Sequence, residues 1–178
     1  MTPLLGISGS LRAGSTNTRL LHAAARAFGA EMTLADLRLP LYDGDLEEAE
    51  GIPAPVRKLA DQIAAAQAVL IACPEYNKAP PGVLKNALDW VSRVKGNPWD
   101  DKPVAIMSAA AGRAGGERTQ FFLRLYMVPF RPRLLMGPEV MIAASGSAFD
   151  EDGSLKDERS RDLLEQQMAA LKRLMALS

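Results

Sequence analysis

The sequence predicts an α/β domain in which a parallel β-sheet is covered by helices on both faces. Short apolar runs alternate along the chain with longer amphipathic segments, a pattern typical of parallel strands joined by crossover helices. One run, Ala68–Cys73, is apolar throughout, as expected for a central strand that is buried on both faces. The length of 178 residues suits a single domain that spans residues 1–178.

Two strand–helix pairs precede this central strand. We expect the first strand at Leu4–Ser8 and a helix rich in alanine and leucine at Asn17–Phe28. A short second strand at Met32–Ala35 precedes a helix at Pro55–Ala66, whose apolar residues recur at helical spacing. The connection between them, Leu39–Pro55, is long and acidic, so we expect a surface loop, and loops of this length are often functional.

The same alternation continues after the central strand. We expect a helix at Gly82–Val94, a fourth strand at Pro103–Met107, and a helix at Glu117–Met127 that stops before a proline. The fifth strand lies within Leu134–Ala144, where a glycine and a proline obscure its start. The last helix, at about Lys156–Leu177, has an apolar stripe that we expect to pack on the sheet.

The scarcity of cysteine and histidine limits the chemistry of the side chains. With Cys73 as the single cysteine, no internal disulfide or cysteine-rich metal site can form, which favours a reducing compartment, most simply the cytoplasm. With His22 as the single histidine, a metal site of several histidines is excluded, and a catalytic triad would have to use that residue. Catalysis by a side-chain nucleophile is therefore disfavoured.

The charge balance points to a small-molecule partner. The chain has 21 basic and 21 acidic residues, so its formal net charge is zero and nothing draws it as a whole to nucleic acid or anionic membrane. No apolar run reaches the roughly 18 residues that a membrane span needs, and the start of the chain lacks the pattern of a secretory signal. We therefore expect a soluble protein that binds neither nucleic acid nor membrane.

Ligands of open α/β sheets bind beyond the carboxyl ends of the strands, and the loop after the first strand is suited to phosphate. This loop, Gly9–Asn17, places small and hydroxyl residues at a helix start, where main-chain N–H groups and the helix dipole favour an anion. The side chains that can bind phosphate are those of Ser10, Arg12, Ser15 and Thr16. The loop has neither a Walker A pattern nor a dinucleotide fingerprint, which favours a terminal monophosphate. The alternative is an ordinary helix start that is capped by Ser15, Thr16 or Asn17, with Arg12 in solvent.

The loops after the third and fourth strands are suited to a planar ring. The first of them begins Pro74, Glu75, Tyr76, Asn77, and its prolines favour a rigid connection that can present main-chain polar groups, with the tyrosine as an aromatic wall. The alternative is a rigid turn whose tyrosine covers the core. The other loop, Ser108–Gly116, is rich in alanine and glycine, so its main chain can approach a ligand closely. A flexible connection is the alternative there.

Combined, the three loops outline a phosphate end, a ring edge and a close main-chain floor. This is the outline of a flavin mononucleotide (FMN) site at the switch point of a flavodoxin-like sheet. The fold expected on this basis is a flavodoxin-like three-layer sandwich, with a five-stranded parallel sheet in the order 2-1-3-4-5.

Two motifs resemble those of the NADPH-dependent FMN reductase family, which includes soluble quinone and chromate reductases. The phosphate-loop pattern G-S-L-R-x-x-S-x-N stands at Gly9–Asn17. The ring-loop pattern P-E-Y-N stands at Pro74–Asn77 and is followed by P-G-x-L-K-N-A-x-D-W at Pro81–Trp90. A further segment, P-L-Y-D at Pro40–Asp43, is also similar to the family, so the resemblance covers nearly the whole chain.

The resemblance implies a role for each motif. Ser10, Arg12, Ser15 and Asn17 would hold the FMN phosphate; Pro74, Glu75, Tyr76 and Asn77 would contact the isoalloxazine, largely through main-chain groups. Ala110 and Gly112 would line the other side of the flavin. Alanines at 79, 109 and 110 stand where many members have serine, so some side-chain hydrogen bonds to the ring are expected to be missing.

The function implied is that of an oxidoreductase with no metal. FMN would take a hydride from NADPH or NADH and pass two electrons to quinones or similar small acceptors, among them chromate, azo compounds or free flavin. The alternative is a non-enzymatic electron carrier of the flavodoxin type, which the zero net charge disfavours because such carriers gain from a one-signed surface. The resemblance also implies a homodimer or homotetramer.

Overall fold

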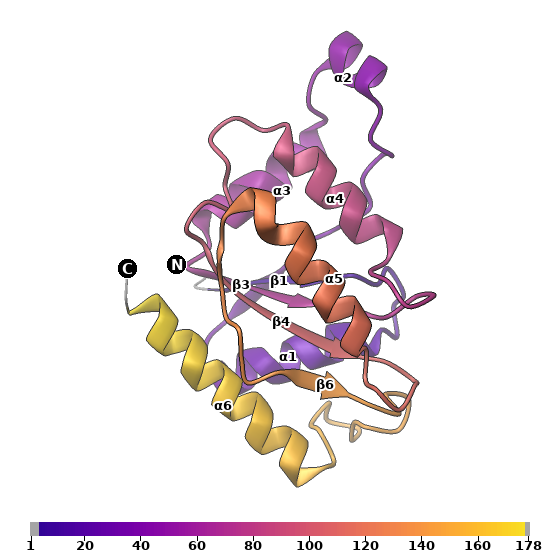
Figure 1. Cartoon of the computed structure of the whole chain (residues 1–178), viewed down its shortest axis with the longest axis vertical. Helices are drawn as coiled ribbons and strands as arrows, with labels where there is room; N and C mark the ends of the chain where they lie inside the picture. The colour runs from indigo at the N-terminus through magenta and orange to yellow at the C-terminus, as the bar shows by residue number, and fades with distance from the viewer. Residues whose placement is uncertain (1–3, 177–178) are drawn as a thin grey trace.

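The computed structural model describes residues 4–176 and has the expected α/β architecture (Figure 1). Its strands are β1 (Leu4–Ser8), β2 (Met32–Leu34), β3 (Ala68–Ala72), β4 (Pro103–Ala109), β5 (Arg133–Leu134) and β6 (Val140–Ile142). Its helices are α1 (Thr16–Phe28), α2 (Gly44–Glu50), α3 (Ala54–Ala65), α4 (Gly82–Ser92), α5 (Glu117–Met127) and α6 (Glu158–Met175), with a 3₁₀ turn η1 (Val128–Phe130) after α5. All paired strands run parallel in the order β2-β1-β3-β4-β5, which confirms the predicted order.

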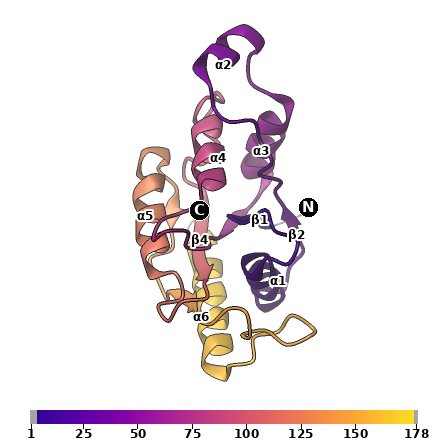
Figure 2. The same ribbon diagram turned by 90° about the vertical axis from the view of Figure 1, so that its right-hand side faces the viewer.

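Each face of the sheet has its own apolar core. Side chains that alternate along β1, β3 and β4 pack against α1 and α6 on one face and against α3, α4 and α5 on the other. Figures 1 and 2 show the two groups of helices on opposite sides of the strands. β3 is buried along its whole length, as the uninterrupted apolar run predicts. The stripe on α6 is also confirmed, because Leu164, Met168 and Leu171 are buried against the sheet; Leu177, the predicted end of that helix, lies outside the described residues.

The fifth position of the sheet is occupied by two short strands rather than one. β5 pairs with the beginning of β4, and β6 pairs with its end. The five residues between them, 135–139, include Gly137 and Pro138, and proline has no N–H to donate to a ladder. The strand expected within Leu134–Ala144 is therefore interrupted at the pair that obscured its start.

The long connection between β2 and α3 contains a helix, α2, that the sequence reasoning did not predict. Asp43 caps it by accepting a hydrogen bond from the N–H of Asp45, yet none of its residues is buried. α4 holds the connection through hydrogen bonds from Asn86 and Trp90 to the carbonyl of Pro40 and through an Arg93–Glu47 ion pair. In both views α2 projects away from the sheet (Figures 1 and 2). Between residues 4 and 176, no helix combines the length and apolar character that a bilayer crossing requires.

Candidate functional site

The three loops singled out in the sequence lie at one edge of the sheet. Because the strands are parallel, β1, β3 and β4 all end at this edge, and the arrows of β4 and β6 in Figure 1 point to it. Main-chain hydrogen bonds tie the strand ends together, from Gly9 to Ala72 at 2.9 Å and from Cys73 to Met107 at 3.0 Å. The first residues of the loops are therefore held in fixed positions relative to one another.

The phosphate loop, residues 9–17, wraps around the N-terminus of α1. Ser15 is the N-cap, and its hydroxyl accepts a hydrogen bond from the N–H of Thr18 at 3.2 Å. Several main-chain N–H groups of the loop and first helical turn donate to no other group among residues 4–176: those of Leu11, Ala13, Gly14, Thr16 and Asn17. Such a cluster at a helix N-terminus is suited to an anion.

The polar side chains of this loop differ in how far they are already engaged. Ser10 is half-buried, and its hydroxyl accepts a long hydrogen bond of 3.4 Å from the N–H of Arg12. Arg12 is exposed, so its guanidinium is available to a phosphate. The hydroxyl of Thr16 donates to that of Ser145 at 3.3 Å, which brings the segment after β6 to the site. The sequence reasoning missed Ser145, although the small and hydroxyl residues that follow the fifth strand were a signal.

Asn17 is turned away from the loop. Its side-chain amide donates to the carbonyl of Ala109 at 2.8 Å, and its side-chain oxygen accepts from the N–H of Ala109 at 3.0 Å. Both contacts are buried, so the side chain joins α1 to the end of β4. Toward a phosphate, Asn17 can offer its main-chain N–H; its side chain supports the neighbouring loop.

The ring loop, residues 74–79, is fixed by a tight turn. Tyr76 and Ala79 exchange main-chain hydrogen bonds of 3.0 and 3.1 Å. Asn77 and Lys78, at its tip, have φ of 51° and 67°, as in a type I′ turn, and both are exposed. Tyr76 is 47% exposed, so it does not cover the core, and its hydroxyl lies 3.5 Å from that of Ser10 in the phosphate loop.

Glu75 lies between the ring loop and α5. One of its carboxylate oxygens accepts hydrogen bonds from the N–H groups of Arg118 and Thr119, at 3.1 and 3.3 Å. The hydroxyl of Thr119 donates to the carbonyl of Pro74 at 3.2 Å. The side chain of Glu75 therefore faces the helix, and its main-chain N–H donates to no other group in residues 4–176.

The third loop, residues 110–116, combines an open part with a closely packed part. Gly112 is exposed, and a Cβ there would meet no atom within 4 Å. By contrast, a Cβ on Gly115 would lie 2.7 Å from the carbonyl carbon of Met141, and one on Gly116 would lie 2.8 Å from Ser108. Ala110 donates its N–H to the carbonyl of Ile142 at 2.9 Å, so its main chain is held by β6. Gly115 and Gly116 thus allow the loop to pass close to the sheet, while Gly112 stays open to a ligand.

The buried thiol beneath the ring loop is protonated at neutral pH. Burial is the main reason that the pKa of Cys73 is raised to about 12; the carboxylate of Glu75 raises it further, and the hydrogen bond with Thr119 opposes the shift. The thiol is therefore the small, unreactive group that the sequence suggests. Among residues 4–176, no group of three or more potential ligands is placed to bind a metal.

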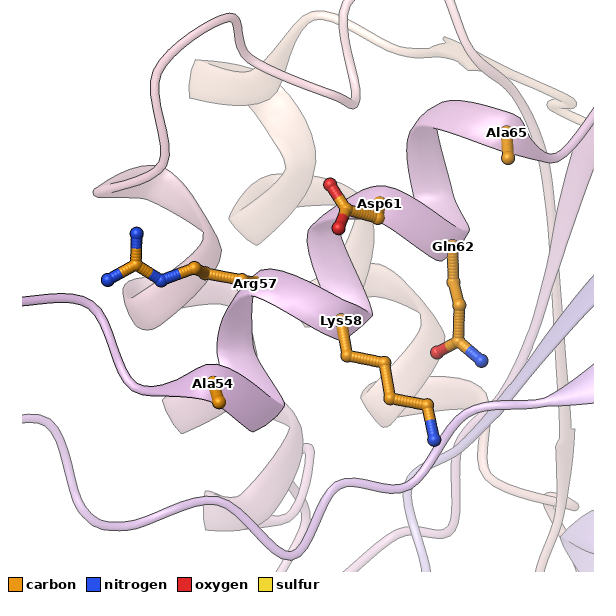
Figure 3. Close-up of a pocket in the computed structure, with 6 residues that line it drawn as sticks. All are labelled: Ala54, Arg57, Lys58, Asp61, Gln62 and Ala65. Carbon is orange, nitrogen blue, oxygen red and sulfur yellow. The ribbon is translucent and has the colours of Figure 1, made fainter.

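A marked hollow of the surface lies away from this edge. It has a volume of about 460 Å³ and is lined by Ala54, Arg57, Lys58, Asp61, Gln62 and Ala65 of α3. Figure 3 shows these side chains along the helix. All of these residues come from one helix, so the depression is a shallow space between neighbouring side chains and not a site built by converging loops. We therefore take the carboxyl edge as the candidate site.

The geometry of this edge fits FMN. The free N–H groups and the arginine suit its phosphate, and the free N–H of Glu75 and the open floor at Gly112 suit a flat, polar ring. A parallel sheet in the order β2-β1-β3-β4-β5, with this site at its switch point, defines a mononucleotide-binding protein of the flavodoxin-like class.

Known proteins share both the sequence and the fold. The model of the family "NADPH-dependent FMN reductase" matches residues 2–146. An NAD(P)H-dependent FMN reductase of Pseudomonas aeruginosa is 46% identical over 171 residues, which cover 94% of this chain and 92% of that protein. A quinone reductase of Escherichia coli is 38% identical, with 91% and 89% of the two chains covered. The structure of FerB, a flavoenzyme NAD(P)H:(acceptor) oxidoreductase from Paracoccus denitrificans, has a TM-score of 0.89 at 31% identity and covers 99% and 98% of the two chains.

The chain belongs to the NADPH-dependent FMN reductase family. This confirms the family, fold class and enzyme class predicted from the sequence motifs.

Proposed function

We propose that this protein is an FMN-dependent oxidoreductase that uses NADPH or NADH to reduce quinones or similar small acceptors. The observation that carries the proposal is the cluster of free main-chain N–H groups at the N-terminus of α1, next to the exposed Arg12. The proposed small acceptors also include chromate, azo compounds and free flavin. The relatives from P. aeruginosa and E. coli, an FMN reductase and a quinone reductase, support this proposal.

The side chains of the site have binding and orienting roles in this proposal. Ser10, Arg12, Ser15 and Thr16 bind the phosphate, together with the free N–H groups of residues 11, 13, 14, 16 and 17. Tyr76, the main chain of residues 74–77 and the main chain of Ala110 and Gly112 enclose the ring. His22 is exposed within α1, and the thiol of Cys73 is buried and protonated, which supports a reaction without a histidine or thiol catalyst. When bound, FMN supplies the redox chemistry, the uptake of a hydride equivalent from NAD(P)H and its delivery to an acceptor.

The carrier alternative is less well supported. A protein that passes electrons between protein partners gains from a one-signed surface, whereas this chain has zero formal net charge. The names of the relatives describe enzymes that act on small molecules. We also propose the cytoplasm as the compartment, because a single buried cysteine suits a reducing environment.

The test starts from the flavin. The purified protein should be yellow or take up FMN on titration, and NADPH or NADH should bleach the bound flavin in the absence of oxygen. Addition of a quinone should then restore the colour, and steady turnover with a quinone would distinguish the enzyme from a carrier. A protein that binds FMN but is not bleached by either nicotinamide would contradict the proposal. A panel of quinones, azo dyes and metal oxyanions would then rank the acceptors.

We further propose that the protein forms a homodimer or a homotetramer through α5. Three apolar side chains of α5, those of Phe121, Phe122 and Leu125, form an exposed stripe at helical spacing that continues to Val128 at the start of η1. Leu125 and Val128 are each 64% exposed. A contiguous apolar stripe of this kind marks an interaction surface more often than an isolated exposed residue does.

A further inference from the structure

The N-terminus of α5 has no cap of its own. Its N-cap residue is Gly116, and glycine has no side chain that could accept a hydrogen bond from the first turn. Glycine is required there for two reasons: φ is 93°, and a Cβ would lie 2.8 Å from Ser108. A serine, threonine or aspartate at position 116 would therefore be strained, so this position cannot supply a capping side chain.

Glu75 occupies the place of the missing cap. Numbered from Gly116, Arg118 and Thr119 are the second and third helical residues, whose N–H groups a cap side chain ordinarily bonds. Both donate to the same carboxylate oxygen of Glu75, 43 and 44 residues away in the sequence. A carboxylate is also favoured at this end of a helix by the macrodipole.

A second contact ties the helix back to the loop. Thr119 is fully buried, and its hydroxyl donates to the carbonyl of Pro74 at 3.2 Å. All three hydrogen bonds run the same way: α5 donates two N–H groups to Glu75 and the Thr119 hydroxyl to Pro74, and the ring loop accepts them. We name this set of contacts, formed by Pro74, Glu75, Arg118 and Thr119, the loop–helix latch.

We propose that Glu75 is a positioning residue: as the cap of α5, it fixes the main chain of residues 74–76 in the orientation that receives the flavin ring. The proposal rests on the proposed function, since it concerns the FMN site. The family resemblance implies that residues 74–77 contact the flavin largely through main-chain groups; the proposal adds a role for the side chain of Glu75, which acts through the helix. A carboxylate held by two N–H groups is also kept from turning toward the ring.

Hydrogen exchange tests the latch in the absence of flavin. In the flavin-free protein, Glu75→Ala should speed exchange at the amides of Arg118 and Thr119 by roughly fivefold or more, because the loss of a cap costs about 1 kcal/mol. Glu75→Gln keeps an oxygen acceptor without the charge, so its exchange rates should lie between those of the native protein and Glu75→Ala. Unchanged rates at both amides in Glu75→Ala would overturn the cap.

FMN titration tests the positioning role. Glu75→Ala should weaken FMN binding by roughly 5- to 30-fold, the equivalent of one or two such contacts, with partial recovery in Glu75→Gln. Thr119→Val, which removes the hydroxyl bonded to Pro74 but keeps the shape of the side chain, should weaken FMN binding in the same direction. The visible circular dichroism of bound FMN should change in both variants, because it reports the orientation of the ring.

Glu117→Ala is the matched control. Glu117 also lies in the first turn of α5, and within residues 4–176 no hydrogen bond or ion pair joins its side chain to residues 73–76. Its removal should reduce helix stability slightly and leave FMN affinity unchanged. Equal losses of affinity in Glu117→Ala and Glu75→Ala would show that Glu75 only stabilises the helix and would overturn the positioning role. If the native chain binds no FMN, the proposed function fails, whereas the exchange experiment still decides whether the cap exists.

Discussion

At the phosphate loop, the structure separates side chains that are already engaged from one that is free. Ser15 caps α1, and Asn17 bonds the main chain of Ala109, so both side chains already form hydrogen bonds within the protein. Arg12 is exposed beside the free N–H groups of the loop. Phosphate binding, as proposed, therefore combines fixed main-chain donors and the hydroxyl groups of the loop with a single flexible cation, Arg12.

Arg12→Ala should weaken FMN binding about tenfold or more, because a hydrogen bond to a charged group contributes roughly 1.5–3 kcal/mol. Titration of the flavin-free protein with FMN measures the change. Arg57→Ala, which removes an exposed arginine on α3 (Figure 3), is the control and should bind FMN like the native chain. Native affinity in Arg12→Ala would remove this residue from the site.

The buried thiol of Cys73 makes stability depend on pH in the alkaline range. Its pKa is raised to about 12 in the folded state, mainly by burial, whereas an unfolded thiol has a pKa of about 8.5. Above the unfolded pKa the unfolded chain holds fewer protons than the folded one, so stability falls as pH rises toward the folded pKa.

Between about pH 8 and about pH 10, this thiol should remove about 2 kcal/mol from the free energy of unfolding. Denaturant titrations of the native chain and of Cys73→Ala at both pH values isolate the effect, since other groups titrate in both proteins. The native chain should lose more stability than the variant over this interval. Equal losses would mean that the thiol ionises as readily in the folded protein as in the unfolded one.

Positions in the site were more predictable than orientations. The motifs located Asn17 and Glu75 at the carboxyl edge, and the structure places both there. Their side chains nevertheless bond Ala109 and the N-terminus of α5, which are distant in sequence. A sequence pattern identifies a loop, but the partner of a polar side chain depends on which strand ends the fold brings together.

Where the fifth strand is interrupted, two helices supply side-chain donors to main-chain carbonyls of the sheet. Gln167 of α6 donates to the carbonyls of Ile106 and Pro138, at 3.0 and 2.9 Å, and so bridges β4 and the segment between β5 and β6. From the other face, Gln120 of α5 donates to the carbonyl of Val140 at 2.8 Å. Both glutamines are buried, and their amides supply donors at the interruption of the ladder.

Gln167→Leu should lower the free energy of unfolding by about 1–3 kcal/mol, because the buried carbonyl of Ile106 and the partly buried carbonyl of Pro138 lose their donor. Urea unfolding measures the loss. Gln166→Leu, at the exposed neighbouring position of the same helix, should change stability by less than about 0.5 kcal/mol. A similar effect of the two substitutions would show that the loss comes from the properties of α6 and not from the bridge to β4.

Helix α2 was not predicted because its stability does not come from an apolar stripe. None of its residues is buried, so the periodic signal that located the other helices is absent. Its support comes from its Asp43 cap and from the Glu47–Arg93 ion pair at 2.9 Å. The run of good helix formers after Asp43 was the available signal.

The two faces of the molecule differ in what they leave exposed. The helices on one face, α1 and α6, pack against each other and the sheet. On the other face, α5 covers the sheet and also presents its apolar stripe outward. Sequence alone predicted the layers because each follows from a local pattern, but exposed and buried apolar residues of α5 look alike in the sequence.

Leu125→Glu should shift the native oligomer toward smaller species, because it places a charge in the proposed interface. Sedimentation velocity measures the distribution. Ala169→Glu adds the same charge to an exposed position of α6 and should leave the distribution unchanged. If Leu125→Glu sediments like the native protein, α5 is not the interface.

The side chains of Asn77 and Lys78, at the exposed tip of the ring loop, can be varied without changing the hydrogen bonds that hold the loop. Their neighbours Tyr76 and Ala79 hold the turn through main-chain hydrogen bonds, which do not involve the side chains at the tip. A library at positions 77 and 78, limited to residues that tolerate positive φ, would thus vary the rim of the proposed site and keep the turn that holds the ring loop. If the proposed function holds, this turn is where engineering of substrate preference would begin.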